Sequence, residues 1–142
     1  MRILFITDNY PPESNAPALR TFEHVNEWVK NKDVYVTILT CCPNFPQGTI
    51  YPGYKNKLID IEFRGKIKII RVWSYIFRNK GKFRRIFDHL SFSISSSVVG
   101  LFLGCDVIIA TSPQFFTTFS AFFISKIKNV PWIFEVRDLW PK

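Results

Sequence analysis

Three short polar stretches hold the residues whose types and spacing fit ligand chemistry. They are residues 8–17, residues 111–114, and the pair Arg137 and Asp138, and each follows a short apolar run. In an open parallel sheet, ligands bind outside the carboxyl ends of the strands. If the apolar runs are strands of one sheet, the three stretches meet along one edge, and we predict a binding site there.

The first stretch offers candidate ligands for a phosphate. Two consecutive prolines make residues 8–17 a long loop, and Pro17 suits the first turn of a helix. Backbone amides at a helix start attract anions. Asn15, Ala16 and Arg20 are therefore predicted to lie near phosphate groups of a ligand. The alternative is a proline-rich loop with a structural role only.

The other two stretches offer candidate ligands for hydroxyl groups. Ser112 stands where the cap of the next helix is expected, so it either caps that helix or, together with Gln114, binds a hydroxyl or a phosphate. Arg137 and Asp138 follow a buried run that ends near Glu135. They form either a polar clamp on the ligand or a simple ion pair.

Several classes of enzyme are disfavoured. All six glycines lie after residue 47, so the first loop lacks the G-x-G-x-x-G pattern that a dinucleotide site needs. The two histidines and three cysteines have no metal-ligand spacing, and there is no D-x-D pair, so neither a metal nor a cofactor is predicted. No catalytic triad can be assembled, and the catalytic residues stay unassigned. An odd number of cysteines, two of them adjacent, favours free thiols in a reducing cytoplasm.

The elements that must position these stretches alternate along the chain. Apolar or β-branched runs predict strands at 2–7, 34–39, 58–63, 67–73, 106–110 and 131–136. Apolar residues at spacings of three and four predict helices at 17–31, 83–104 and 114–128. We therefore expect one α/β domain over residues 1–142, with a Rossmann-like, mostly parallel sheet and helices on both faces. The short gap at 64–66 predicts a β-hairpin insertion.

The basic charge is concentrated in the middle of the chain. The net charge is +8, and residues 51–85 carry eleven basic and two acidic side chains. Such a segment attracts phosphates or anionic lipid, or it is a solvated face. The basic run 78–85 precedes an apolar helix, which is the arrangement of an interfacial membrane anchor. The uncharged stretches 90–105 and 107–125 are interpreted as buried elements of a soluble fold, and the helical spacing of the aromatics argues against nucleic-acid binding.

Seven motifs extend over essentially the whole chain. They are DNYPPE at 8–13, NAPA at 15–18, CPNFP at 42–46, GYKNK at 53–57, IRVW at 70–73, ATSPQFF at 110–116 and EVRDLWP at 135–141. In combination they resemble the amino-terminal half of family 4 glycosyltransferases. The most similar members are the N-acetylfucosaminyl-type transferases of O-antigen and capsule assembly.

The resemblance implies a GT-B architecture, in which two Rossmann-like domains face each other across a cleft. Family members retain the anomeric configuration and use no bound metal. Their amino-terminal domain holds the acceptor, often a sugar on a polyprenyl diphosphate. Their carboxy-terminal domain holds the nucleotide sugar and a pair of glutamates, and these 142 residues do not contain it. The chain by itself is therefore expected to be inactive.

The sequence also departs from the family pattern at two places. Many members have Gly-Gly in the first loop, where this chain has Asn15-Ala16. Others have a histidine after the strand that here precedes Ser112 and Gln114. By resemblance, Asn15, Ala16 and Arg20 would lie near the donor phosphates and Ser112 and Gln114 would contact sugar hydroxyls. Arg137 and Asp138 would line the cleft.

The resulting hypothesis is the amino-terminal domain of a retaining glycosyltransferase of cell-surface polysaccharide synthesis. It would move a sugar from a nucleotide-sugar donor to a polyprenyl-linked or oligosaccharide acceptor. We expect it in the cytoplasm, peripheral on the inner face of the cell membrane. The alternative is a basic, non-enzymatic module that binds an anionic membrane surface, and a dinucleotide enzyme is a third, weaker reading because of the glycine-free first loop.

Overall fold

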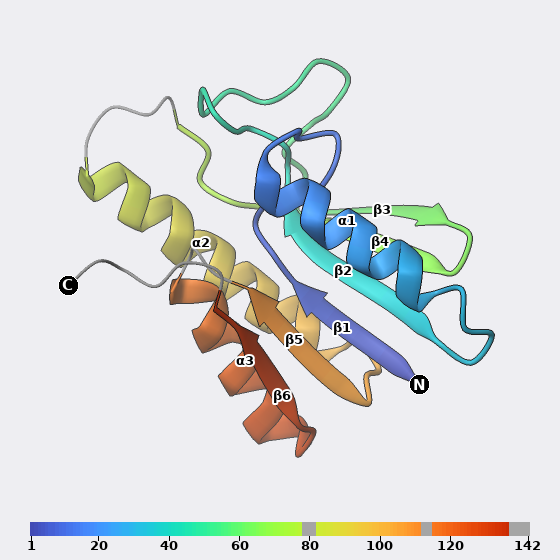
Figure 1. Cartoon of the computed structure of the whole chain (residues 1–142). Coiled ribbons are helices and arrows are strands. Elements are labelled where there is room, and N and C mark those ends of the chain that lie inside the picture. Colours follow the sequence, from blue (N-terminus) through green and yellow to red (C-terminus); the bar gives the residue numbers. More distant parts are fainter. Residues whose placement is uncertain (78–81, 112–114, 137–142) are drawn as a thin grey trace.

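The structure, a computed structural model, describes residues 1–77, 82–111 and 115–136 (Figure 1). Within these residues it contains one six-stranded sheet and three helices. The strands are β1 (Arg2–Ile6), β2 (Tyr35–Cys41), β3 (Ile59–Arg64), β4 (Ile67–Val72), β5 (Val107–Thr111) and β6 (Trp132–Glu135). The helices are α1 (Ala16–Trp28), α2 (Lys82–Leu101) and α3 (Phe115–Lys128).

The sheet is mostly parallel and doubly wound. Its strand order is β3-β4-β2-β1-β5-β6, and among these pairings only β3 with β4 is antiparallel. From β1 the chain moves outward through β2 to the β3–β4 hairpin at one side of the sheet. It then returns through α2 to β5, on the other side of β1, and continues to β6, so the direction of winding reverses between β1 and β5. The predicted α/β, Rossmann-like fold is confirmed, and the β-hairpin insertion is β3 with β4.

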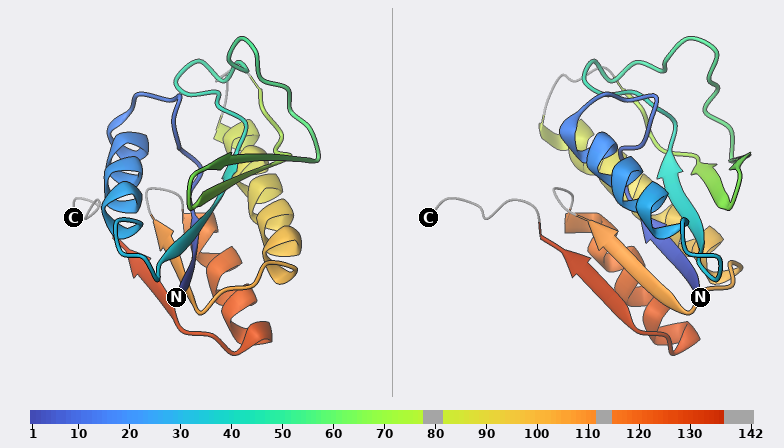
Figure 2. Two further views of the ribbon diagram at one scale, coloured as in Figure 1. Left: turned by 90° about the vertical axis from the view of Figure 1, so that its right-hand side faces the viewer. Right: turned by 45° about the vertical axis from the view of Figure 1, so that its right-hand side comes forward.

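Alternate residues of β1 enter two separate cores. Leu4 and Ile6 pack in the core beneath α2 and α3, whereas Ile3 and Phe5 pack in the core beneath α1. Successive side chains of a strand point to opposite faces. A strand covered on both faces therefore reads as a continuous apolar run. Figure 2 shows α1 on one face of the sheet and α2 with α3 on the other.

Helices α2 and α3 pack closely because small residues line their contact. The Ser120 hydroxyl oxygen lies 3.0 Å from that of Ser93 and 2.9 Å from that of Ser96. A Cβ added at Gly100 would meet the side chain of Ile124 on α3. The expectation that residues 90–105 and 107–125 are buried is met only in part. Strand β5 and the inner faces of both helices are buried, whereas the outer faces are exposed, for example at Ile94 and Phe119, because no other element of the described residues covers them. Among the residues that the structure describes, no helix is long and apolar enough to cross a membrane.

The predicted and observed boundaries differ where long-range contacts decide them. Helix α1 ends at Trp28 instead of Asn31, and the ammonium group of Lys66, in the turn before β4, donates hydrogen bonds to the carbonyls of Val29 and Asn31 beyond that end. Strand β2 continues to Cys41 because its last residues pair with β4. Neither contact is visible in a local sequence pattern.

The close approach of α2 to α3 predicts that a side chain at Gly100 is costly. Gly100→Val is expected to lower the free energy of unfolding by about 1–3 kcal/mol, because the added carbons overpack a buried contact. Gly104→Val is the control, since a Cβ there meets only the exposed guanidinium of Arg2, which can move. Urea unfolding of both variants measures the difference, and equal losses would contradict this packing.

Candidate functional site

The candidate site lies at the carboxyl edge of the sheet, where β1, β5 and β6 end and α1 begins (Figure 1). Thr111, the last residue of β5, is the register partner of Glu135, the last residue of β6. Arg20 of α1 reaches the same place, because its Nε lies 3.6 Å from Glu135 Oε1. Arg20, which follows the first predicted stretch, and the residues that lead into the other two stretches are therefore together. The remaining predicted site residues lie outside the described residues: Ser112, Gln114, Arg137 and Asp138.

Asn15 is the N-cap of α1. Its Oδ1 accepts a hydrogen bond from the Ala18 amide at 2.9 Å, and its Nδ2 donates to Asn9 Oδ1 at 2.8 Å. Ala16 is the first residue of the helix and is exposed. A phosphate bound at this helix start would have to compete with Asn15 for the Ala18 amide. Asn15 thus shapes the helix start, whether or not it also touches a ligand.

Glu13 is a buried acid that the sequence analysis did not single out as a site residue. Its side chain is 2% exposed, and Oε1 accepts hydrogen bonds from the backbone amides of Asn44 (2.8 Å) and Phe45 (2.9 Å). Burial raises the pKa of Glu13 above its ordinary value, although these amides and the Arg71 cation oppose the rise. Glu13 therefore ties the first loop to the segment that follows β2.

Arg71 of β4 is the second buried charge that was missed. It is 4% exposed, and it donates hydrogen bonds to the carbonyls of Pro11 (2.8 Å) and Cys41 (3.2 Å). Its guanidinium carbon lies 5.1 Å from the centre of the Tyr54 ring. One cation thus joins the first loop, the end of β2 and the segment after it. The available signal was an arginine between Ile70 and Val72 in a mostly apolar strand run.

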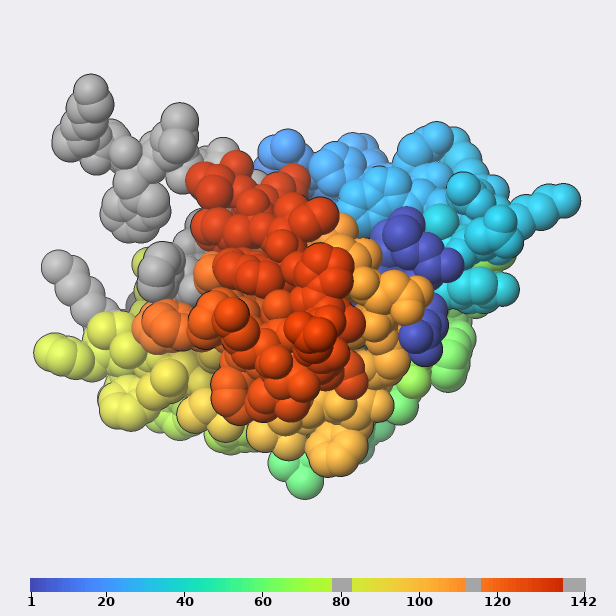
Figure 3. All heavy atoms as spheres, turned by 90° about the horizontal axis from the view of Figure 1, so that it is seen from below, coloured from blue at the N-terminus to red at the C-terminus, as the bar shows by residue number. Residues whose placement is uncertain are grey.

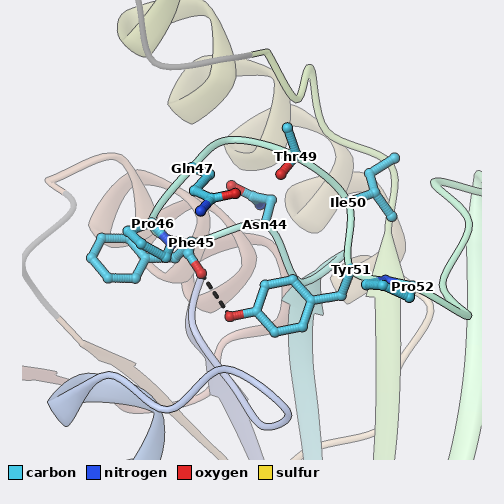
Figure 4. A pocket seen from close by; sticks show the side chains of 8 residues that line it. All are labelled: Asn44, Phe45, Pro46, Gln47, Thr49, Ile50, Tyr51 and Pro52. Carbon is cyan, nitrogen blue, oxygen red and sulfur yellow. Dashed lines mark hydrogen bonds between the residues drawn. The ribbon is translucent and has the colours of Figure 1, made fainter.

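A hollow of about 260 Å³ lies in the segment after β2 (Figure 4). The Tyr51 hydroxyl donates a hydrogen bond to the Phe45 carbonyl at 2.7 Å, which closes the segment on itself. Amide, hydroxyl and aromatic side chains around one hollow can bind a neutral polar ring through hydrogen bonds and stacking. The lining residues are Asn44, Phe45, Pro46, Gln47, Thr49, Ile50, Tyr51 and Pro52.

Two acids at the carboxyl edge, Asp8 and Asp88, have pKa values raised toward neutral pH. Burial raises the pKa of Asp8, directly after β1, to about 7, and the nearby Glu13 and Asp88 carboxylates add to the rise. Burial also raises the pKa of Asp88, on α2, to about 6, against the effect of Arg85. Asp8 is therefore a group that exchanges a proton in the physiological range.

Several of the described basic residues of segment 51–85 have partners within the fold or are buried. Lys57 pairs with Asp60 at 2.8 Å and Arg64 pairs with Glu62 at 2.7 Å. Lys66 binds the carbonyls at the end of α1, and Arg71 is buried. Four of the eleven basic residues thus have local partners or are buried, which weakens the interpretation of the whole segment as one anion-binding surface.

In residues 1–77, 82–111 and 115–136, no group of three or more His, Cys, Asp or Glu side chains could hold a metal ion. Comparison with models of protein families finds no match, and comparison with curated proteins finds none either.

The buried Arg71 predicts a large loss of stability when it is removed. Arg71→Met leaves two buried carbonyls and the Glu13 carboxyl without their cation, so we expect a loss of about 3–5 kcal/mol in the free energy of unfolding. Arg64→Met is the matched control on the neighbouring strand, because its surface pair with Glu62 is worth at most about 1 kcal/mol. Urea unfolding compares the two, and similar losses would refute the role given to Arg71.

The raised pKa of Asp8 predicts how stability depends on pH. Between pH values of about 4 and 7 the folded chain keeps this proton and the unfolded chain loses it, so rising pH lowers the free energy of unfolding. Asp8→Asn should flatten this decline and exceed the wild type in stability at about pH 8. Urea unfolding across this range measures the effect, with Asp33→Asn, at an exposed position, as the control. An unchanged pH slope in Asp8→Asn would show that Asp8 ionises normally.

Proposed function

We propose that this chain forms the acceptor-side domain of a retaining glycosyltransferase related to family 4. One observation carries the proposal: Arg20, Thr111 and Glu135, from three separate parts of the chain, meet at the carboxyl edge of a doubly wound sheet. This edge is where open α/β sheets bind their ligands. Most of the motifs that resemble the family lie in the segments that meet at this edge or that Glu13 and Arg71 connect to it.

The proposed acceptor is a saccharide, free or carried on a lipid diphosphate. The hollow at residues 44–52 offers the sugar amide and hydroxyl hydrogen bonds and aromatic faces. Glu13 holds the start of this segment against the first loop, so the hollow stays close to the helix start. Arg20 is the exposed cation at that helix start and is the group proposed to meet phosphate oxygens.

The other assignments stay predictions at this site. Asn15 and Ala16 would lie beside the donor phosphates, Ser112 and Gln114 would contact sugar hydroxyls, and Arg137 and Asp138 would line the cleft. The leaving nucleotide diphosphate develops negative charge that cations and amides must stabilise. The resemblance assigns most of those groups, and the donor itself, to a second domain. The nucleotide sugar enters as a substrate, and no further cofactor is proposed.

The proposal predicts anion-dependent binding at Arg20. A sugar 1-diphosphate with a short alkyl chain in place of the lipid should bind to the wild-type chain in isothermal titration calorimetry. Arg20→Gln should weaken this binding about 10-fold, because a charge-assisted hydrogen bond is lost. Arg2→Gln is the matched control, since Arg2 is also exposed and also pairs with an acid, Asp106, but at the opposite edge of the sheet.

Two results would contradict the proposal. One is the absence of binding by a chain that is folded, as judged by its cooperative unfolding. The other is equal weakening by Arg20→Gln and Arg2→Gln, which would indicate general attraction of an anion to a basic protein.

A further inference from the structure

Helix α2 carries a long apolar stripe that faces away from the sheet. Phe83, Phe87 and Ile94 are 80%, 61% and 58% exposed. Their spacings of three and four residues place them on one side of the helix. Buried residues such as Phe92 lie on the opposite side, in the core against the sheet. The stripe comprises Phe83, Ile86, Phe87, Leu90, Ile94 and Val98.

Helix α3 extends this apolar surface. It packs beside α2 through the Ser93–Ser120 contact, on the same face of the sheet (Figure 2). Its outward residues are again large and apolar: Phe119, Phe122, Phe123 and Ile127 are all exposed. Figure 3, viewed from below, shows α3 and β6 in the middle of the underside of the molecule. A soluble monomer rarely exposes so many large apolar groups in one area.

The charges around this surface have one sign. Residues 82–101 and 115–128 contain five basic residues and one acid, Asp88, a net charge of +4. Asp88 is half-buried, near Asp8. The Arg84 guanidinium lies 4.2 Å from the centre of the Phe77 ring, and the Lys126 ammonium lies 5.6 Å from that of Phe122. The cations thus border the aromatic groups directly.

We propose that the outer surface of α2 and α3 docks onto an anionic lipid bilayer, with its phenylalanines in the headgroup region and its cations on lipid phosphates. Helices with an apolar face and basic flanks lie in the membrane interface in this way. The charge pattern argues against a second copy of the chain as the occupant, because two such faces would bring like charges together. This surface includes Arg84 and Arg85, the last two residues of the basic segment 51–85, whereas other cations of that segment are paired or buried: Lys57, Arg64, Lys66 and Arg71.

The docking also orients the carboxyl edge of the sheet. Helix α2 starts near that edge, since the Ser91 hydroxyl in its first half accepts a hydrogen bond from the Tyr75 amide, just beyond the carboxyl end of β4, at 2.7 Å. Binding of lipid phosphates by Arg84 and Arg85 would therefore place the membrane beside the candidate site. Access of that site to a lipid-linked acceptor rests on the proposed function, whereas the docking itself does not.

The test is co-flotation of the chain with vesicles. We expect binding to vesicles of 30% phosphatidylglycerol in phosphatidylcholine at low salt, and at least 10-fold less binding at high salt or to pure phosphatidylcholine. The double variant Phe87→Ser with Ile94→Ser should lose at least 10-fold in binding. The matched control is Leu58→Ser with Phe63→Ser, which removes two similarly exposed side chains at and beside β3. Cooperative urea unfolding of each variant shows that it is folded.

Two charge-reversal variants complete the experiment. Arg84→Glu with Arg85→Glu should abolish binding to the anionic vesicles, whereas Lys30→Glu with Lys32→Glu, beyond the end of α1, should change it little. No vesicle binding, or equal losses in the α2 and β3 variants, would overturn the proposal. So would a wild-type dimer that the α2 variant converts to a monomer without any vesicle binding, since the face would then be an interface between copies.

Discussion

Two buried charges hold the carboxyl edge of the sheet in one arrangement. Arg71 binds carbonyls of the first loop and of β2, and Glu13 binds two amides of the segment after β2. Burying such groups is unfavourable unless they are hydrogen-bonded. Their contacts therefore specify where both proline-containing segments lie. The helix start with Asn15 and the hollow at residues 44–52 depend on that placement, so the candidate site rests on interactions that do not themselves face a ligand.

The fold could be predicted because each element carries a local signal. Strand β1 is a continuous apolar run since both of its faces are covered, and α1 begins at the Asn15 cap followed by Pro17. The site was less accessible to sequence reasoning. Glu13 binds residues more than 30 positions away, and Arg71 reaches 60 positions back to Pro11. No spacing rule encodes such contacts. The hollow likewise forms only after its segment closes through Tyr51 and Phe45.

Charge counted along a sequence is a poor guide to charge on a surface. Segment 51–85 is the most basic part of the chain, yet Lys57, Arg64, Lys66 and Arg71 all have local partners. The start of α2 belongs to the same segment, and there Arg84 and Arg85 lie beside an apolar stripe whose exposure only the structure reveals. The two surfaces suit different tasks. The carboxyl edge presents hydrogen-bonding groups for a ligand, and the outer helices present an amphipathic layer.

The proposed function requires a saccharide with phosphate groups to bind where the three stretches converge. A crystal structure of the chain with the alkyl sugar diphosphate bound tests it most directly. We expect diphosphate oxygens within hydrogen-bonding distance of Arg20 at the start of α1, and the sugar ring toward the hollow lined by Asn44 and Tyr51. A ligand bound at the opposite edge, beside Arg2 and Asp106, would contradict it.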